Sequence, residues 1–108
     1  MERCRVILAD RHREFRDGVR RMLDGESDFE IVGEVEEAIA LLRLIRFIPP
    51  GPLTVVLDAA LPNLPWMETI RRIKADRADV MILLLNIGED EEYVSQAFAL
   101  GADGYLMK

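Results

Sequence analysis

The sequence is short of cysteine, positive charge and long apolar runs, and each shortage excludes a class of protein. Its single cysteine, Cys4, cannot form an internal disulfide bond, so a disulfide-stabilised scaffold is excluded and a reducing, cytoplasmic setting is expected. The formal net charge of -6 argues against nucleic-acid binding by this segment, because phosphate-binding surfaces are usually basic. The apolar runs are far shorter than the ~20 residues that cross a bilayer, and we expect neither a signal peptide nor a membrane partner.

Glycine is also missing where a phosphate-binding loop would need it. The stretch "ADRHREFRDG", which follows the first apolar run, has no glycine before Gly18. Phosphate loops need glycine early because the backbone must approach the phosphate closely. We therefore expect that the chain is not an enzyme, and a small nucleotide- or flavin-binding enzyme domain is retained only as a distant alternative.

What the chain does contain is a regular alternation of short apolar runs and longer segments of helical period. Its 108 residues suffice for one domain with a core of its own. Strands are expected at 4–10, 29–35, 53–58, 79–86 and 103–108, and helices at 12–25, 36–47, 64–76 and 89–100. This alternation predicts an α/β fold in which right-handed crossovers join parallel strands and helices cover both faces.

Polar residues end four of the predicted strands, and "VVLDAALPN" carries one of them, Asp58, directly after its apolar run. The other three are Asp10, Asn86 and Lys108. The carboxyl ends of parallel strands meet at one edge of the sheet, so these side chains should converge there. A carboxylate in such a place can attack phosphorus, a lysine can hold a phosphoryl oxygen, and a second carboxylate can help to hold magnesium. Taken singly, Asp10 could instead cap the next helix, and Lys108 could be an ordinary solvated lysine.

Three stretches, "ILADRH", "VVLDAALPN" and "GADGYLMK", make the whole chain resemble the receiver domain of two-component response regulators. The runs "RDGVRRML" and "DFEIVGEVEEA" are most similar to regulators with a LuxR-type helix-turn-helix output domain. The resemblance implies a flavodoxin-like, doubly wound, five-stranded parallel sheet of order 2-1-3-4-5 with five helices. The expected single domain, 1–108, would lack the fifth helix and any output domain.

The same resemblance implies roles for individual residues. Asp58 matches the phosphoacceptor, Asp10 the first member of an acidic pair, and Lys108 the lysine that contacts the phosphoryl group. Tyr105 matches the aromatic switch residue. The backbone carbonyl of Ala60 matches a ligand of the metal ion, beside Asp10 and Asp58.

Three positions depart from the family pattern. Arg11 stands where the second acid, a magnesium ligand, is usual; Asn86 replaces a serine or threonine; and Trp66 replaces a glycine. Two acids and two bases leave the cluster neutral, whereas the usual three acids and one lysine leave two negative charges. A neutral cluster has little reason to hold a divalent cation. Arg11 could stand in for the metal beside Asp58, or it could turn out to solvent.

Two mechanisms therefore remain for a signalling receiver, and both would belong to a transcriptional regulator. In one, Asp58 accepts a phosphoryl group from a sensor histidine kinase in the ordinary way. In the other, which the departures favour, the receiver is atypical, with no cofactor or only weakly bound Mg2+. Self-association is expected through the sheet face that the fifth helix would cover, and DNA would be bound only through an output domain absent here. His12 is expected to be a surface histidine, because no second histidine is present to share a metal.

Overall fold

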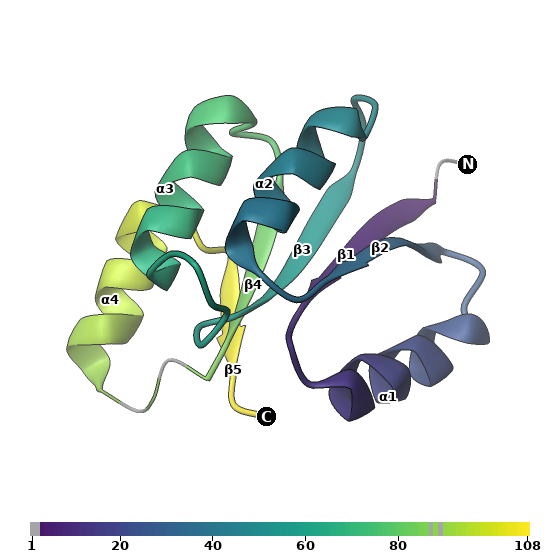
Figure 1. The fold of residues 1–108 in the computed structure, drawn as a ribbon, viewed down its shortest axis with the longest axis horizontal. Coiled ribbons are helices and arrows are strands. Elements are labelled where there is room, and N and C mark those ends of the chain that lie inside the picture. Colours follow the sequence, from purple (N-terminus) through teal and green to yellow (C-terminus); the bar gives the residue numbers. More distant parts are fainter. Residues whose placement is uncertain (1–2, 87, 89) are drawn as a thin grey trace.

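The computed structural model describes residues 3–86, 88 and 90–108, in which five strands form one central sheet (Figure 1). The strands are β1 (Cys4–Ala9), β2 (Phe29–Val35), β3 (Leu53–Asp58), β4 (Met81–Leu85) and β5 (Gly104–Leu106). The helices are α1 (Arg13–Asp24), α2 (Ala38–Phe47), α3 (Trp66–Asp76) and α4 (Glu91–Leu100). The alternation predicted from the sequence is therefore confirmed for the described residues.

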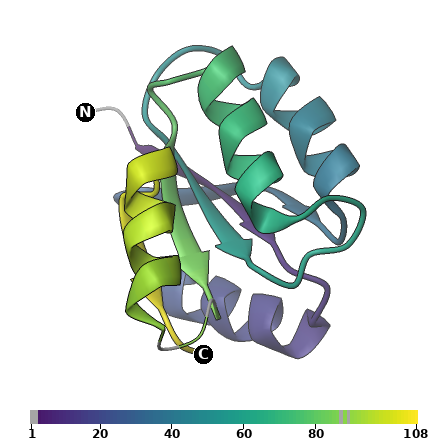
Figure 2. The same cartoon turned by 90° about the vertical axis from the view of Figure 1, so that its left-hand side faces the viewer.

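All neighbouring strands pair in parallel, in the order β2-β1-β3-β4-β5. This is the predicted order of a flavodoxin-like sheet, and it is confirmed. Figure 2 shows α2, α3 and α4 side by side on one face of the sheet and α1 on the other. None of the described helices has both the length and the apolar character needed to cross a membrane.

Burial along the strands follows this unequal cover. On β3 and β4, the side chains on the three-helix face belong to the main core and are fully buried, as Val55 and Ile82 are. Their neighbours on the α1 face, such as Thr54 and Leu83, are only half-buried. On β1 both faces are covered, and its last four residues are all buried. The sheet is therefore most deeply buried at its centre, where β1 and β3 end.

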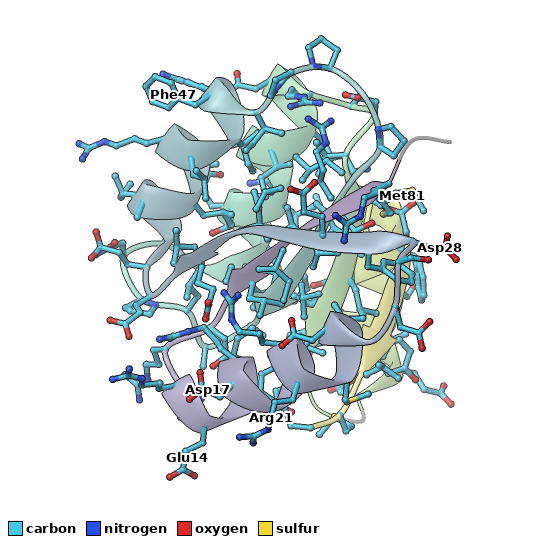
Figure 3. All side chains as sticks on the ribbon, turned by 90° about the vertical axis from the view of Figure 1, so that its right-hand side faces the viewer. Glu14, Asp17, Arg21, Asp28, Phe47 and Met81 are labelled. Carbon is cyan, nitrogen blue, oxygen red and sulfur yellow. The ribbon has the colours of Figure 1, made fainter. Side chains whose placement is uncertain are left out.

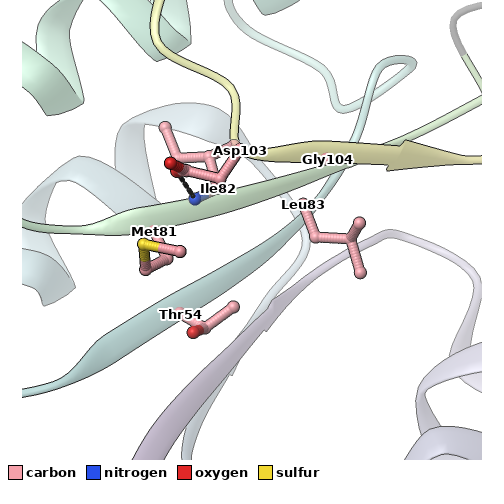
Figure 4. A pocket seen from close by; sticks show the side chains of 6 residues that line it. All are labelled: Thr54, Met81, Ile82, Leu83, Asp103 and Gly104. Carbon is pink, nitrogen blue, oxygen red and sulfur yellow. Dashed lines mark hydrogen bonds between the residues drawn. The ribbon is translucent and has the colours of Figure 1, made fainter. Parts of the chain in front are cut away.

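The open part of the α1 face is hollowed into a shallow groove of about 200 Å³ (Figure 4). It is lined by Thr54, Met81, Ile82, Leu83, Asp103 and Gly104. Met81 is 49% exposed. At the rim, Asp103 accepts a hydrogen bond from the backbone N–H of Ile82, which fastens the start of β5 to β4.

Several predicted boundaries move by a few residues, each for a local reason. The third helix begins at Trp66 because Pro65 is extended, and its carbonyl accepts the Thr69 N–H. The fifth strand stops at Leu106, whose carbonyl accepts the Asn86 N–H. Asn86 itself adopts a left-handed backbone conformation. The fourth helix begins at Glu91, behind an Asp90 cap; the predicted start at residue 89 lies outside the described residues.

Candidate functional site

Two carboxylates lie buried at the carboxyl edge of the sheet. Asp10 follows β1, Asp58 ends β3, and each is only 1% exposed. They lie close together because β1 and β3 are adjacent parallel strands in register. The Asp10 N–H donates to the carbonyl of Val35, which continues the β1–β2 ladder into the site. Buried carboxylates are costly unless a cation or hydrogen bonds compensate them.

Lys108 supplies that cation. Its Nζ lies 2.5 Å from Asp10 Oδ2 and 3.1 Å from Asp58 Oδ2. The same atom lies 3.0 Å from the Nδ1 of His12 and 4.6 Å from the centre of the Phe15 ring. Asp10 Oδ2 has no well-aligned hydrogen bond within the described part of the chain, so the nearby ammonium balances its charge through the ion pair. One ammonium therefore serves both acids.

His12 is exposed, as expected of a surface histidine, but it also lies at the site. Its Nδ1 is 3.1 Å from Asp10 Oδ1 and 3.6 Å from Asp58 Oδ2, while its side chain remains 55% exposed. Its backbone N–H donates to Asp10 Oδ1 at 2.7 Å. The spacing of Asp10 and His12 could have predicted this position, because an aspartate often accepts a hydrogen bond from the N–H two residues later and so closes a tight turn.

Arg11 lies between Asp10 and His12 in that turn and is exposed. Among the described residues it forms no ion pair with Asp10 or Asp58, whose cationic partners are Lys108 and His12. The expectation that Arg11 stands beside Asp58 in place of a metal ion is wrong in this structure. The reason is the bond from His12 N–H to Asp10 Oδ1, which folds the backbone so that residue 12, not residue 11, returns to the site.

Asn86 holds the backbone near Lys108 rather than contacting Asp58. Its φ is 63°, and its Oδ1 accepts the Lys108 N–H at 2.9 Å. Its own N–H donates to the Leu106 carbonyl at 3.0 Å. This pair of bonds joins the end of β4 to the segment after β5, and so it fixes where the Lys108 side chain begins.

Of the remaining predicted site residues, Ala60 touches the Asp58 carboxylate through its backbone. The N–H of Ala60 donates to Asp58 Oδ1 at 3.0 Å, which leaves Asp58 Oδ2 facing the lysine. Tyr105 is 39% exposed, and its ring packs edge-on against Phe98 at 6.2 Å between centroids. Trp66 begins α3 and packs against the core as a partly buried side chain.

The possible metal ligands at the carboxyl edge of the sheet fit magnesium poorly. Asp10, His12 and Asp58 can offer three ligand atoms that lie within 4.8 Å of one another. Magnesium prefers six oxygen ligands, and an imidazole nitrogen better suits zinc, copper or nickel. The Lys108 ammonium also lies against both carboxylates, and a cation would have to displace it.

The two oxygens of the Asp58 carboxylate have different partners. Asp58 Oδ1 is oriented by the Ala60 N–H, and Oδ2 lies at the Lys108 ammonium. A carboxylate so placed can act as a nucleophile towards phosphorus, and the ammonium can stabilise the charge that develops on the transferred group.

A family model of the response regulator receiver domain matches residues 6–108. The transcriptional regulatory protein DegU of Brevibacillus brevis is 32% identical over 106 residues, which cover 98% of this chain and 44% of that protein. The nitrate/nitrite response regulator protein NarL of Escherichia coli strain K12 is 28% identical over 107 residues, which cover 99% of this chain and 49% of that protein. The chain thus spans about half the length of these curated relatives.

Solved structures agree with the family match. A two-component response regulator of the LuxR family from Aurantimonas sp. SI85-9A1 superposes with a TM-score of 0.86 at 30% identity, over 99% of this chain and 75% of that one. The isolated REC domain of RcsB from Salmonella enterica serovar Typhimurium superposes with a TM-score of 0.88, over 99% of this chain and 78% of that one. Its identity is 23%, so this second likeness concerns the fold alone.

Proposed function

Since the chain belongs to the family of response regulator receiver domains, we propose that it is an atypical receiver in which magnesium-dependent phosphorylation of Asp58 is weakened. The phosphoryl donor would be a sensor histidine kinase. A carboxylate oxygen of Asp58 would attack the phosphorus, the bond between phosphorus and the donor would break, and the donor would leave with a proton. Lys108 would hold the negative oxygens of the transferred group.

The observation that carries this proposal is the position of the Lys108 ammonium. Its Nζ lies within 3.1 Å of both buried carboxylates and 3.0 Å from His12 Nδ1. It therefore occupies the space between the groups that would bind a divalent cation. With Arg11 in place of the second acid, only Asp10 and Asp58 remain as carboxylate ligands. Two carboxylates that already share an ammonium bind magnesium less strongly than three that repel one another.

The wider role would be the regulation of transcription. DegU carries that description in its name, and the Aurantimonas structure is described as a LuxR-family response regulator. Contact with DNA would belong to an output domain, because the chain carries a net charge of -6. A cytoplasmic location and weak self-association through the open sheet face belong to the same proposal.

Intact-protein mass spectrometry after incubation with acetyl phosphate tests the central step. We expect a slow, partial phosphoryl adduct that Asp58→Asn abolishes, and magnesium at ~10 mM should change its yield by less than about twofold. Glu30→Gln, a surface substitution on β2, is the matched control and should behave like the parent. Rapid, complete conversion that requires magnesium would instead make the domain an ordinary phosphoacceptor.

A further inference from the structure

An arginine is buried on the inner side of α1, directly beneath the loop that carries Asp10. Arg16 is 8% exposed. Figure 3 shows Glu14 and Arg21 on the same helix pointing away from the sheet, and Asp17 is exposed. Buried arginines are rare, because the guanidinium loses its hydration and must find several acceptors in the protein. The position of Arg16 therefore calls for a role other than solubility.

The Arg16 side chain finds three acceptors in two segments of the chain, the turn after β1 and the end of β2. Its Nη1 donates to the backbone carbonyl of Asp10 at 2.5 Å, its Nε donates to Glu34 at 3.0 Å, and its Nη2 donates to Glu36 at 3.1 Å. Glu34 lies near the end of β2 and Glu36 just beyond it. The backbone N–H of Arg16 also donates to the carbonyl of His12. A planar guanidinium with fixed donor directions is suited to hold such a set, which a lysine cannot match.

The carbonyl of Asp10 belongs to the same tight turn that brings His12 to the carboxylates. The side chain of Asp10 faces Asp58 and Lys108, while its carbonyl is held from below by Arg16. A movement of that carbonyl would rotate the peptide plane between residues 10 and 11. It would thereby shift the residues that follow, including His12, whose N–H binds the Asp10 carboxylate. The bond from Arg16 thus acts on the site through the backbone.

We propose that Arg16 is a positioning residue: its guanidinium fixes the turn at residues 10–12 against the end of β2, and so sets the place of Asp10 and His12 relative to Asp58. For its consequence on phosphoryl transfer, the inference rests on the proposed function. Its structural part, the placement of His12, stands independently of any reaction.

Arg20, one turn further along α1, provides the matched control. It also pairs with Glu34, but it is 43% exposed and makes no bond to Asp10 or to residues 11 and 12. The hydrogen bonds from Arg20, and then that from Arg16, hold the pKa of Glu34 below its usual range. The two arginines therefore share one partner and differ in the contact that the inference concerns.

The experiment compares Arg16→Met, Arg16→Lys and Arg20→Met with the parent. His12 is the only histidine, so its ring nitrogens give a single set of NMR signals that report directly on the turn. The ring signals are recorded at one fixed pH, together with the hydrogen exchange of the Asp10 and His12 amides and the rate of acetyl phosphate labelling at Asp58. All spectra are taken at a temperature at which each variant is folded by circular dichroism.

For Arg16→Met we expect His12 signals displaced towards those of a free histidine, amide exchange at His12 faster by about tenfold, and labelling slower by a similar factor. Arg16→Lys should keep the charge but not the geometry, and should show the same displacement of the His12 signals. Arg20→Met should resemble the parent in all three measurements. If Arg16→Met does not fold, Arg16→Lys decides the outcome.

Unchanged His12 signals and amide exchange in a folded Arg16 variant, or equal changes in Arg20→Met, would overturn the inference and leave Arg16 a purely structural residue. Failure of the proposed function looks different. The parent would then show no labelling at Asp58, while the His12 signals would still respond to Arg16 substitution.

Discussion

Asp10 lies between two clusters of charge that are balanced in opposite ways. The carboxylate cluster comprises Asp10, Asp58, His12 and Lys108, and the guanidinium cluster comprises Arg16, Arg20, Glu34 and Glu36. In the first, two carboxylates that are each 1% exposed share one ammonium. In the second, two guanidinium groups face two carboxylates, with Glu34 shared by both arginines, and the buried Arg16 has three acceptors.

The difference separates the candidate site from the charges that support its backbone. In the carboxylate cluster one ammonium faces two acids, and under the proposed function Asp58 would be the one that accepts a phosphoryl group. The guanidinium cluster satisfies its donors, so it holds the backbone of the turn at residues 10–12 in place. The same fold thus keeps charge incompletely paired at the edge of the sheet and fully paired beneath it.

Breaking the guanidinium cluster should have the largest effect. Arg16→Met should lower the free energy of unfolding by about 2–3 kcal/mol, because the carbonyl of Asp10 loses its charged donor in a buried place. Arg20→Met removes an exposed pair and should cost far less. Urea denaturation of both variants measures the difference, and equal losses would show that the burial of Arg16 carries no extra weight.

Breaking the carboxylate cluster should destabilise the fold less and change its response to metal. Lys108→Met leaves Asp10 and Asp58 facing each other without the ammonium, at an expected cost of about 1–2 kcal/mol. Magnesium should then restore part of that loss, because it would bind only the folded pair of acids. Thermal melting with and without magnesium tests this. The parent should not respond, and a response of equal size in both proteins would contradict the account.

The acid side of the guanidinium cluster gives a pH dependence. The pKa of Glu34 is lowered chiefly by its hydrogen bond with Arg20, so its contribution to stability is present above its unfolded-state pKa. That contribution is lost as the pH falls through the lower, folded-state pKa. Glu34→Gln should therefore lose less stability than the parent between pH 6 and pH 3. Glu30→Gln, on the same strand but without an ion pair to any described residue, should follow the parent.

Of these substitutions, Arg11→Asp should have the smallest effect on stability. Arg11 is exposed and unpaired among the described residues, so Arg11→Asp should leave the free energy of unfolding within experimental error. The added negative charge, next to Asp10 in the chain, should nevertheless raise magnesium affinity at the mouth of the site without direct ligation. Calorimetric titration of the variant checks this, with Arg13→Asp as a control on the neighbouring surface. Equal binding by the two variants would mean that a negative charge at position 11 does not act on the site.

The fold was accessible from the sequence because periodicity and parallel connection constrain it strongly. Apolar runs of strand length alternating with helical segments leave few arrangements, and polar residues at strand ends must then share one edge. The strand order itself came from the family resemblance, since alternation alone does not specify it. Boundaries shifted where single contacts decide them, as at Pro65 and Asn86.

Side-chain direction at the site was harder to predict. Which of residues 11 and 12 returns to the carboxylates depends on one hydrogen bond inside a turn. The burial of Arg16 was also missed. It lies seven residues before Leu23 and so on the same side of α1, a relation that a search for apolar residues alone passes over. A charged residue on the helix face that packs against the sheet is the signal that would have identified Arg16.

Isothermal titration of magnesium into the folded domain tests the central claim most directly. We expect no saturable heat below about 5 mM magnesium, because the Lys108 ammonium already lies against both Asp10 and Asp58 and the second acid is absent. Saturable binding of one ion per chain at sub-millimolar magnesium, abolished by Asp58→Asn, would contradict it.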